Sequence, residues 1–305
     1  MQSDNSTPSI KAISNLPAVN PYLAILVGVL AVSFSSLFVK LSSAPAIVIA
    51  TYRLLFTFLI LAPYTAAVKR EDLRALTLKD TLLAAVSGCF LAMHFVTWFL
   101  SLQYTSVASS VVLVTTQPIF VVIGSYLCFR ESVPLKSMVG GVIALAGSFY
   151  IGATDFQLGS QALWGDFLAL AAAILVSGYL LIGRRLRSRI SLPAYTFVLY
   201  GASSLTLVLA TWGAGLDFYP YSTRDWLLFL ALAIVCTIMG HTVFNWALRY
   251  VQASVVAVSV LGEPIGAIVW ALLFLSEAPS LRQLIGGAII LTGLLIFTLK
   301  SQEVS

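Results

Sequence analysis

The chain has 305 residues, of which 59% are hydrophobic and only 10% charged, and its mean hydropathy is +0.97. Soluble domains are about half apolar and about a quarter charged, so this composition excludes a soluble globular protein. The net charge of +5 does not point to nucleic acid as a partner, because the basic residues stand in short links between apolar segments.

The chain begins with a polar tail, residues 1–20, which lacks the basic-then-apolar order of a cleavable signal peptide. We expect this tail to be disordered and cytoplasmic. Apolar runs of roughly 20 residues without period-2 alternation then predict membrane-spanning helices. The ten predicted spans are residues 21–39, 46–68, 80–101, 106–129, 134–152, 163–182, 193–213, 225–247, 253–276 and 283–300.

The positive charges are distributed unevenly between the two sides of this predicted bundle. Thirteen Lys and Arg residues fall in the tails and links of one side, and three fall on the other. Cytoplasmic loops of membrane proteins carry the excess of positive charge. The sequence therefore predicts a multi-pass protein of the cell (inner) membrane with both termini in the cytoplasm.

The chain also contains an internal repeat. Residues 102–149 align without a gap with residues 248–295. Because five spans per repeat is an odd number, the second copy must enter the membrane from the opposite side. The predicted fold is all-α, with two inverted five-helix repeats at 21–152 and 163–300. The matched pairs that carry this alignment are Pro118/Pro264, Glu131/Glu277, Gly140/Gly286, Gly141/Gly287 and Gly147/Gly293.

Together with the Tyr52–Arg53 pair, these spans and the duplicated Pro…Glu…Gly-Gly…Gly pattern resemble the drug/metabolite transporter superfamily, in its EamA-type branch. The resemblance covers roughly residues 21–300. It implies a secondary transporter, an exporter or permease of small metabolites such as amino acids, that works by alternating access. Efflux of amphipathic drugs or cations and flipping of lipids are the alternatives, and an intramembrane enzyme is disfavoured.

One carboxylate stands near the middle of a predicted span. Glu263 lies in the ninth span, where a charge is costly unless it faces a partner or a water-filled cavity. The following Pro264 lacks a backbone donor and predicts a helix kink, and Gln117–Pro118 is its counterpart in the first repeat. The functional interpretation is a site for a proton or a cationic substrate, with Gln117 opposite. The structural interpretation is a hydrogen-bonded Glu at a kink that the fold requires.

The two histidines lie on corresponding helices of the repeats. His94 belongs to a polar stripe on the third span, with Trp98 one turn beyond it, and His241 belongs to a stripe on the eighth span that continues to Asn245. Histidine titrates near neutral pH and suits proton coupling, whereas the structural alternative is a hydrogen bond that ties two helices. We favour the cavity for His94 and the helix tie for His241, and expect Trp98 and Asn245 to line the cavity.

Arg53 lies within the second span. A guanidinium there suits a substrate carboxylate, but a side chain that reaches the outer surface or forms a fixed ion pair is the favoured interpretation. A different role is expected for four glycines at seven-residue spacing, because small residues let helices approach closely. Gly140, Gly147, Gly286 and Gly293 should pack the fifth and tenth helices against neighbours or against a second protomer.

No cofactor and no metal site are predicted, since the three cysteines lie in apolar spans without metal-ligand spacing. The expected partners are a small-molecule substrate and the lipid bilayer. Proton coupling and a homodimer are left open.

Overall fold

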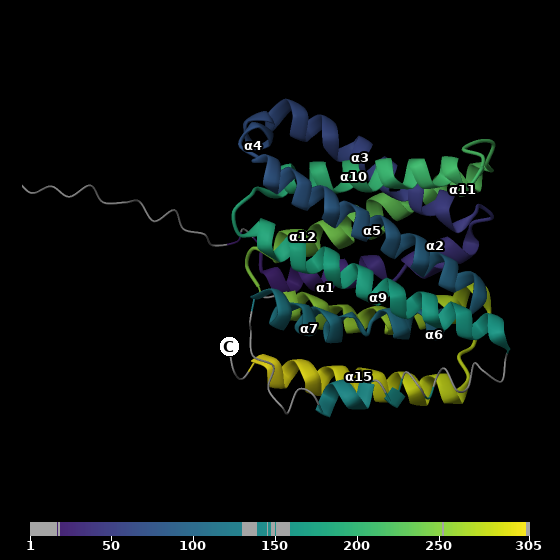
Figure 1. The fold of residues 1–305 in the computed structure, drawn as a ribbon. Helices are drawn as coiled ribbons and strands as arrows, with labels where there is room; N and C mark the ends of the chain where they lie inside the picture. Colours follow the sequence, from purple (N-terminus) through teal and green to yellow (C-terminus); the bar gives the residue numbers. More distant parts are fainter. Residues whose placement is uncertain are drawn as a thin grey trace, which may run out of the picture.

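In a computed structural model, the residues that the structure describes are 17, 19–129, 139–144, 146, 147, 150, 159–251 and 253–302. Within these ranges the regular structure is helical, and eight helices are long and apolar enough to cross a membrane. A shorter apolar helix covers Leu281–Gly293. The helices run side by side in one bundle (Figure 1). The predicted tail lies almost wholly outside the described residues, as does much of the predicted fifth span.

The first half of the chain follows the predicted spans closely. The second span is one helix with the predicted bounds, and the first and fourth spans are each divided into two helices. The helices are α1 (Pro21–Val32), α2 (Ser35–Leu41), α3 (Ala46–Val68), α4 (Arg70–Arg74), α5 (Leu78–Tyr104), α6 (Val107–Val114) and α7 (Gln117–Phe129). Residues 139–144 are also helical.

The second half contains more departures from the α-helix. Its eighth span changes to a π-helix and its ninth span includes a 3-10 turn. The elements are α9 (Ser160–Arg187), α10 (Leu192–Gly213), α11 (Thr223–Ala231), η1 (Leu232–Thr242), α12 (Val243–Ala247), α13 (Ala253–Ser259), η2 (Val260–Gly262), α14 (Glu263–Trp270), η3 (Ala271–Leu275) and α15 (Leu281–Gln302).

Both repeats interrupt a helix at the same place. The break between α6 and α7 falls at Thr115 and Thr116, directly before Gln117–Pro118. The tightened turn η2 falls directly before Glu263–Pro264. A proline cannot donate to the carbonyl four residues earlier, so each interruption lies where the helix loses that hydrogen bond.

Two aspartates tie the repeats together at opposite ends of the bundle (Figure 1). At the start of α5, Asp80 forms an ion pair with Arg189, which lies in the link between α9 and α10. At the start of α11, Asp225 accepts hydrogen bonds from Ser42 Oγ (2.7 Å), Ser43 N (2.9 Å) and Ser43 Oγ (2.8 Å) in the link between α2 and α3. We call these contacts the Asp80 clasp and the Asp225 clasp.

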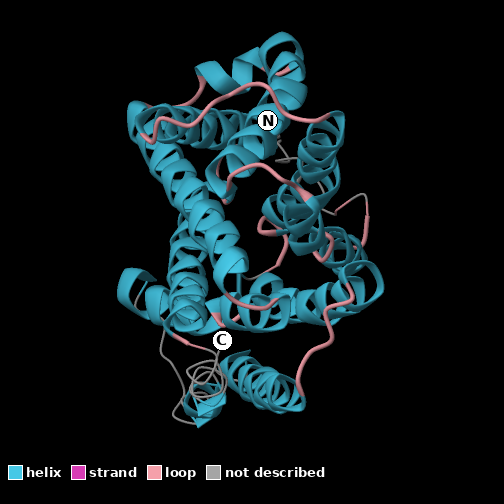
Figure 2. Ribbon diagram, turned by 90° about the vertical axis from the view of Figure 1, so that its right-hand side faces the viewer, coloured by secondary structure: helices cyan, strands magenta, loops and turns pink. Residues whose placement is uncertain are grey.

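The glycines expected to pack the fifth and tenth helices bring these two helices against each other. A Cβ atom added at Gly147 would lie 2.9 Å from the Gly286 carbonyl oxygen, and one added at Gly293 would lie 2.7 Å from the Gly140 carbonyl oxygen. The contact is reciprocal, as a pseudo-two-fold axis requires. This pair lies beside the rest of the bundle, beyond α6 and α7 (Figures 1 and 2).

Candidate functional site

A cavity lies between the two repeats, at the level where both helices are interrupted. Its volume is about 40 Å³, counted as the space that the centres of water molecules can occupy. On this measure one water needs about 10–15 Å³, so the cavity has room for a few waters. Its polar and aromatic lining residues include Ser35, Arg53, His94, Trp98, Thr115, Gln117, Tyr179, His241, Phe244 and Glu263.

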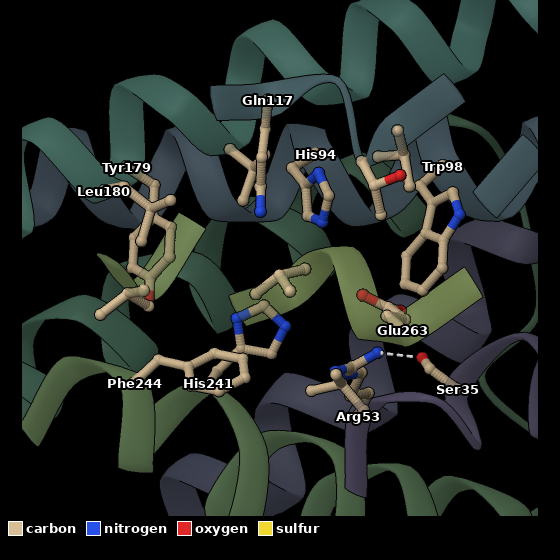
Figure 3. A pocket seen from close by; sticks show the side chains of 16 residues that line it. Ser35, Arg53, His94, Trp98, Gln117, Tyr179, Leu180, His241, Phe244 and Glu263 are labelled. Atoms are coloured by element: carbon tan, nitrogen blue, oxygen red, sulfur yellow. Dashed lines mark hydrogen bonds between the residues drawn. The ribbon is translucent and has the colours of Figure 1, made fainter. Parts of the chain in front are cut away.

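Arg53 of α3 is fully buried in the wall of this cavity. Its Nε donates to Thr237 Oγ1 (2.8 Å), and its Nη1 donates to Ser35 Oγ (2.7 Å; Figure 3). The guanidinium carbon lies 3.9 Å from the centre of the Phe95 ring, a cation–π contact. The side chain therefore does not reach the outer surface, and no described carboxylate lies within ion-pair distance of it.

One donor of Arg53 is left over. Nη2 is buried and has no hydrogen-bond partner within the described part of the chain. Leaving a buried charged donor unpaired is costly, so such a group is expected where a ligand or ordered water completes the set. Trp98 Nε1, another buried donor in the same wall, also has no partner there.

Glu263 supplies the carboxyl group of the cavity. It is the first residue of α14 and is 7% exposed, and its carboxylate forms no hydrogen bond with a described side chain. Arg53 lines the same cavity but does not form an ion pair with it. Figure 3 shows Glu263 between Arg53 and Trp98. The cavity thus holds a guanidinium and a carboxyl group that do not form a direct ion pair.

Both histidines line the cavity, as expected for His94, but it is His94 rather than His241 that ties two helices. His94 Nδ1 lies 2.9 Å from the Ala172 carbonyl oxygen of α9. A carbonyl only accepts, so Nδ1 carries the proton in this bond and Nε2 is the acceptor of the neutral ring. His94 therefore ties α5 to α9 as well as lining the cavity. His241 instead packs by ring contacts against Phe95 (5.2 Å) and Tyr179 (6.2 Å).

Asn245 lies outside the lining. It is fully buried, and its Oδ1 accepts a hydrogen bond from Tyr179 Oη (2.8 Å), which does line the cavity. Its backbone carbonyl accepts from Arg187 Nε (3.1 Å). The sequence predicted that His241 and Asn245, four residues apart, share one face of an α-helix. Because η1 is a π-helix with a wider turn, residues four apart there do not lie on one face.

Gln117 and the two prolines stand where the helix interruptions meet the cavity. Gln117 is buried in the lining, and its backbone carbonyl oxygen accepts a hydrogen bond from Ser177 Oγ (3.1 Å) of α9. Pro118 and Pro264 are buried beside it and beside Glu263. The four packing glycines lie away from the cavity, in the contact between the fifth and tenth helices.

Sequence reasoning missed the residues that hold Arg53 in place. Ser35, Thr237 and Phe95 contact the guanidinium from three different helices. The Ser-rich start of α2 was a signal for such a role, because hydroxyl groups in a span need a partner. Tyr179 was missed as well, although a tyrosine in the middle of a span carries the same signal.

The described residues contain no group of three or more His, Cys, Asp or Glu side chains that could hold a metal ion. What the cavity offers is charge, hydrogen-bond donors and aromatic walls.

Comparison with known proteins identifies the fold. The model of the EamA-like transporter family matches residues 20–153 and again residues 163–299. The chain belongs to the EamA-like transporter family. The predicted fold class, an all-α membrane protein of two inverted five-helix repeats, is thereby confirmed, as is the interpretation as a secondary transporter.

Relatives of this EamA-like transporter carry transporter names. An uncharacterized transporter of Archaeoglobus fulgidus is 28% identical over 226 residues, covering 72% of this chain and 75% of the relative. The uncharacterized transporter YetK of Bacillus subtilis is 27% identical over 239 residues, with coverages of 75% and 71%. The pseudopaline exporter CntI of Pseudomonas aeruginosa is 25% identical over 220 residues, with coverages of 71% and 74%. A crystal structure at 19% identity has a TM-score of 0.67 over 93% of this chain and 98% of its own chain, which shows the same fold.

Proposed function

We propose that this EamA-like transporter exports small zwitterionic metabolites, amino acids and related compounds, from the cytoplasm across the inner membrane. The observation that carries this proposal is a guanidinium and a carboxyl group that lie unpaired with each other in one cavity. Among the described residues, Arg53 Nη2 has no hydrogen-bond acceptor and the Glu263 carboxyl group has no side-chain hydrogen-bond donor.

A zwitterion satisfies both groups at once. The planar guanidinium of Arg53 binds a carboxylate through Nη2, and the carboxylate of Glu263 accepts from an ammonium group. Trp98 and Phe244 give the side chain of the substrate an apolar surface. An amphipathic cation would suit Glu263 and the aromatic wall, but it would leave the Arg53 charge uncompensated.

Transport proceeds by alternating access between the repeats at 21–152 and 163–300. The cavity has space only for waters, and the Asp80 and Asp225 clasps hold the two ends of the bundle. Substrate therefore enters only after one clasp opens and the repeats separate at that end. With both termini in the cytoplasm, the Asp80 clasp faces the cytoplasm. The pseudopaline exporter at 25% identity supports export as the direction.

Proton entry drives this export through Glu263. A proton and the ammonium of the substrate compete for one carboxylate, so loading one requires release of the other. His94, which lines the same cavity, is the second candidate for the proton. The substrate itself leaves chemically unchanged, which distinguishes the transporter from an intramembrane enzyme and is checked by mass spectrometry of the released compound.

A thermal-stability scan with matched ligands tests the proposal. Free amino acids are compared with N-acetylated amino acids, which lack the ammonium, and with amino-acid amides, which lack the carboxylate. A ligand that binds the folded state alone stabilises it by about 2.7 kcal/mol at a hundredfold excess over Kd. We expect a shift with the free amino acids only.

Other outcomes of the scan would contradict this proposal and identify a different function. A shift with amides and lipophilic amines but not with free amino acids identifies a cation exporter. The absence of a shift with every soluble compound, together with movement of labelled lipid in vesicles, identifies a flippase.

A further inference from the structure

A groove of about 710 Å³ lies on the outside of the bundle, away from the central cavity, between the start of α5 and the end of α9. Four of its lining residues are apolar: Leu78, Leu82, Leu83 and Val86. The other two are Lys79 and Arg185, and within the part of the chain that the structure describes no acidic side chain lines the groove.

The apolar residues form a continuous track along α5. Leu78, Leu82 and Val86 recur every four residues, so they share one helix face, and they are 75%, 59% and 47% exposed. Eight residues of α-helix extend about 12 Å along the axis, a length that a lipid acyl chain can cover. In a membrane protein this face lies against lipid rather than water.

The two cations stand at the end of this track that meets the membrane boundary. Both Lys79 and Arg185 are exposed, and neither forms an ion pair with a described residue. The nearby carboxylate of Asp80 does not neutralise them, because it is 5% exposed and is paired with Arg189 and Thr77. Two unpaired cations above an apolar track complement an anionic head group above an acyl chain.

We propose that this groove is a binding site for one anionic phospholipid. Lys79 and Arg185 hold the head-group phosphate, and an acyl chain lies along Leu78, Leu82 and Val86. Basic pockets at the cytoplasmic ends of membrane helices are a recurring way of holding anionic lipids. The lipid would bridge α5 and α9, which carry His94 and Tyr179 into the central cavity.

Native mass spectrometry of the full chain from nanodiscs tests this site. The nanodiscs contain phosphatidylcholine with a minority of phosphatidylglycerol. We expect the protein to retain phosphatidylglycerol over phosphatidylcholine, and the Lys79→Gln/Arg185→Gln pair to lower that preference by about tenfold or more, since each cation near an anionic surface contributes measurably. The matched control, Lys69→Gln/Arg70→Gln, removes the same charge at the same end of the bundle but outside the groove. It should retain the lipid.

A second variant separates the head group from the chain. Leu82→Trp keeps both cations and fills the apolar track, so retention of phosphatidylglycerol should also fall. Inorganic phosphate added to phosphatidylcholine nanodiscs should neither bind nor stabilise the protein. The proposal is overturned if the groove pair retains the lipid like the unaltered chain, if the control pair loses it equally, or if inorganic phosphate displaces it.

Discussion

Arg53 and Glu263 show how a membrane interior can hold a guanidinium and a carboxyl group in one cavity without an ion pair between them. Two hydroxyl groups and the Phe95 ring compensate most of the guanidinium, while Nη2 remains without a partner among the described residues. Had the two side chains formed a closed ion pair, a substrate would have to break it before binding. Their separation leaves each group able to contact a ligand, at the cost of two incompletely paired buried polar groups.

Replacing Arg53 by lysine tests this arrangement. Lysine keeps the charge but loses the planar fork that reaches Ser35, Thr237 and the cavity at once. A hydrogen bond to a charged group contributes about 1.5–3 kcal/mol, so we expect Kd for the amino acid to rise about tenfold to a hundredfold in a calorimetric titration.

The control for this change is Arg187→Lys. It also removes a buried guanidinium, but one that bonds backbone carbonyl groups outside the cavity. It should lower the melting temperature and leave Kd unchanged. Equal losses of affinity in both variants would contradict a direct role for Arg53.

Glu263 yields a prediction about pH. Because a protonated carboxyl cannot attract an ammonium group, acidification should weaken substrate binding to the unaltered chain. Glu263→Gln should bind about as weakly as the acidified unaltered chain, and its Kd should no longer vary with pH. Titrations of both proteins across a pH series provide the measurement.

His94→Ala serves as the comparison. If His94 carries the proton instead, this variant loses the pH dependence of Kd and Glu263→Gln keeps it. That result would leave the substrate site in place and move the coupling group to His94.

At the scale of elements, the fifth and tenth helices form a separate pair that packs through glycine. The reciprocal approach of Gly147 to the Gly286 carbonyl and of Gly293 to the Gly140 carbonyl leaves no room for a side chain. The interior of a lipid bilayer offers no hydrophobic drive for helix pairing, so close van der Waals contact is what holds such a pair. These glycines are therefore used within one chain, and the pair buttresses α6 and α7 from outside the cavity.

Gly293→Ala should destabilise the protein by about 1–3 kcal/mol, the usual cost of overpacking a close contact. Its Cβ would lie 2.4 Å from Ala144 N, a backbone atom that cannot move alone. The readout is the melting temperature in detergent. Gly213→Ala is the matched control, because nothing lies within 4 Å of the added Cβ. A drop of the same size in the control would point to a general intolerance of alanine.

The whole molecule is organised by the relation between its repeats. Each repeat interrupts one helix at the cavity, each supplies one aspartate that clasps the other repeat, and the two clasps lie at opposite ends. Alternating access needs two clasps of comparable strength. A transporter that strongly favours the inward-open or the outward-open state converts only slowly to the other state. The clasps differ in chemistry: one is a half-exposed ion pair, and the other is a set of hydrogen bonds to one carboxylate.

Weakening one clasp should open the cavity at that end alone. Half-exposed ion pairs contribute roughly 0.2–1 kcal/mol, so Asp80→Asn should raise access from its end by up to about fivefold. The measurement uses a cysteine-free chain with Val256→Cys in the cavity lining, labelled by an impermeant maleimide from either side of oriented vesicles. Asp225→Asn should give the opposite preference. Equal labelling from both sides in each variant would show that the clasps do not gate the cavity.

The sequence by itself determined the class of this protein. Apolar run length and the need to satisfy every backbone group within lipid are local properties, so the spans, the helical fold and the inverted repeat could all be read from residue order. The places of Pro118 and Pro264 in the sequence also located the helix interruptions, since proline loses its hydrogen bond whatever surrounds it.

The tertiary structure alone decided the site. Arg53 and Glu263 belong to different repeats, and their meeting depends on how α3 and α14 pack. The π-helix η1 removed Asn245 from the lining, and only packing determined that the glycines of the fifth and tenth helices face each other. Such contacts depend on side-chain volumes and crossing geometry along the whole bundle, whereas hydropathy records only whether each residue prefers lipid or water.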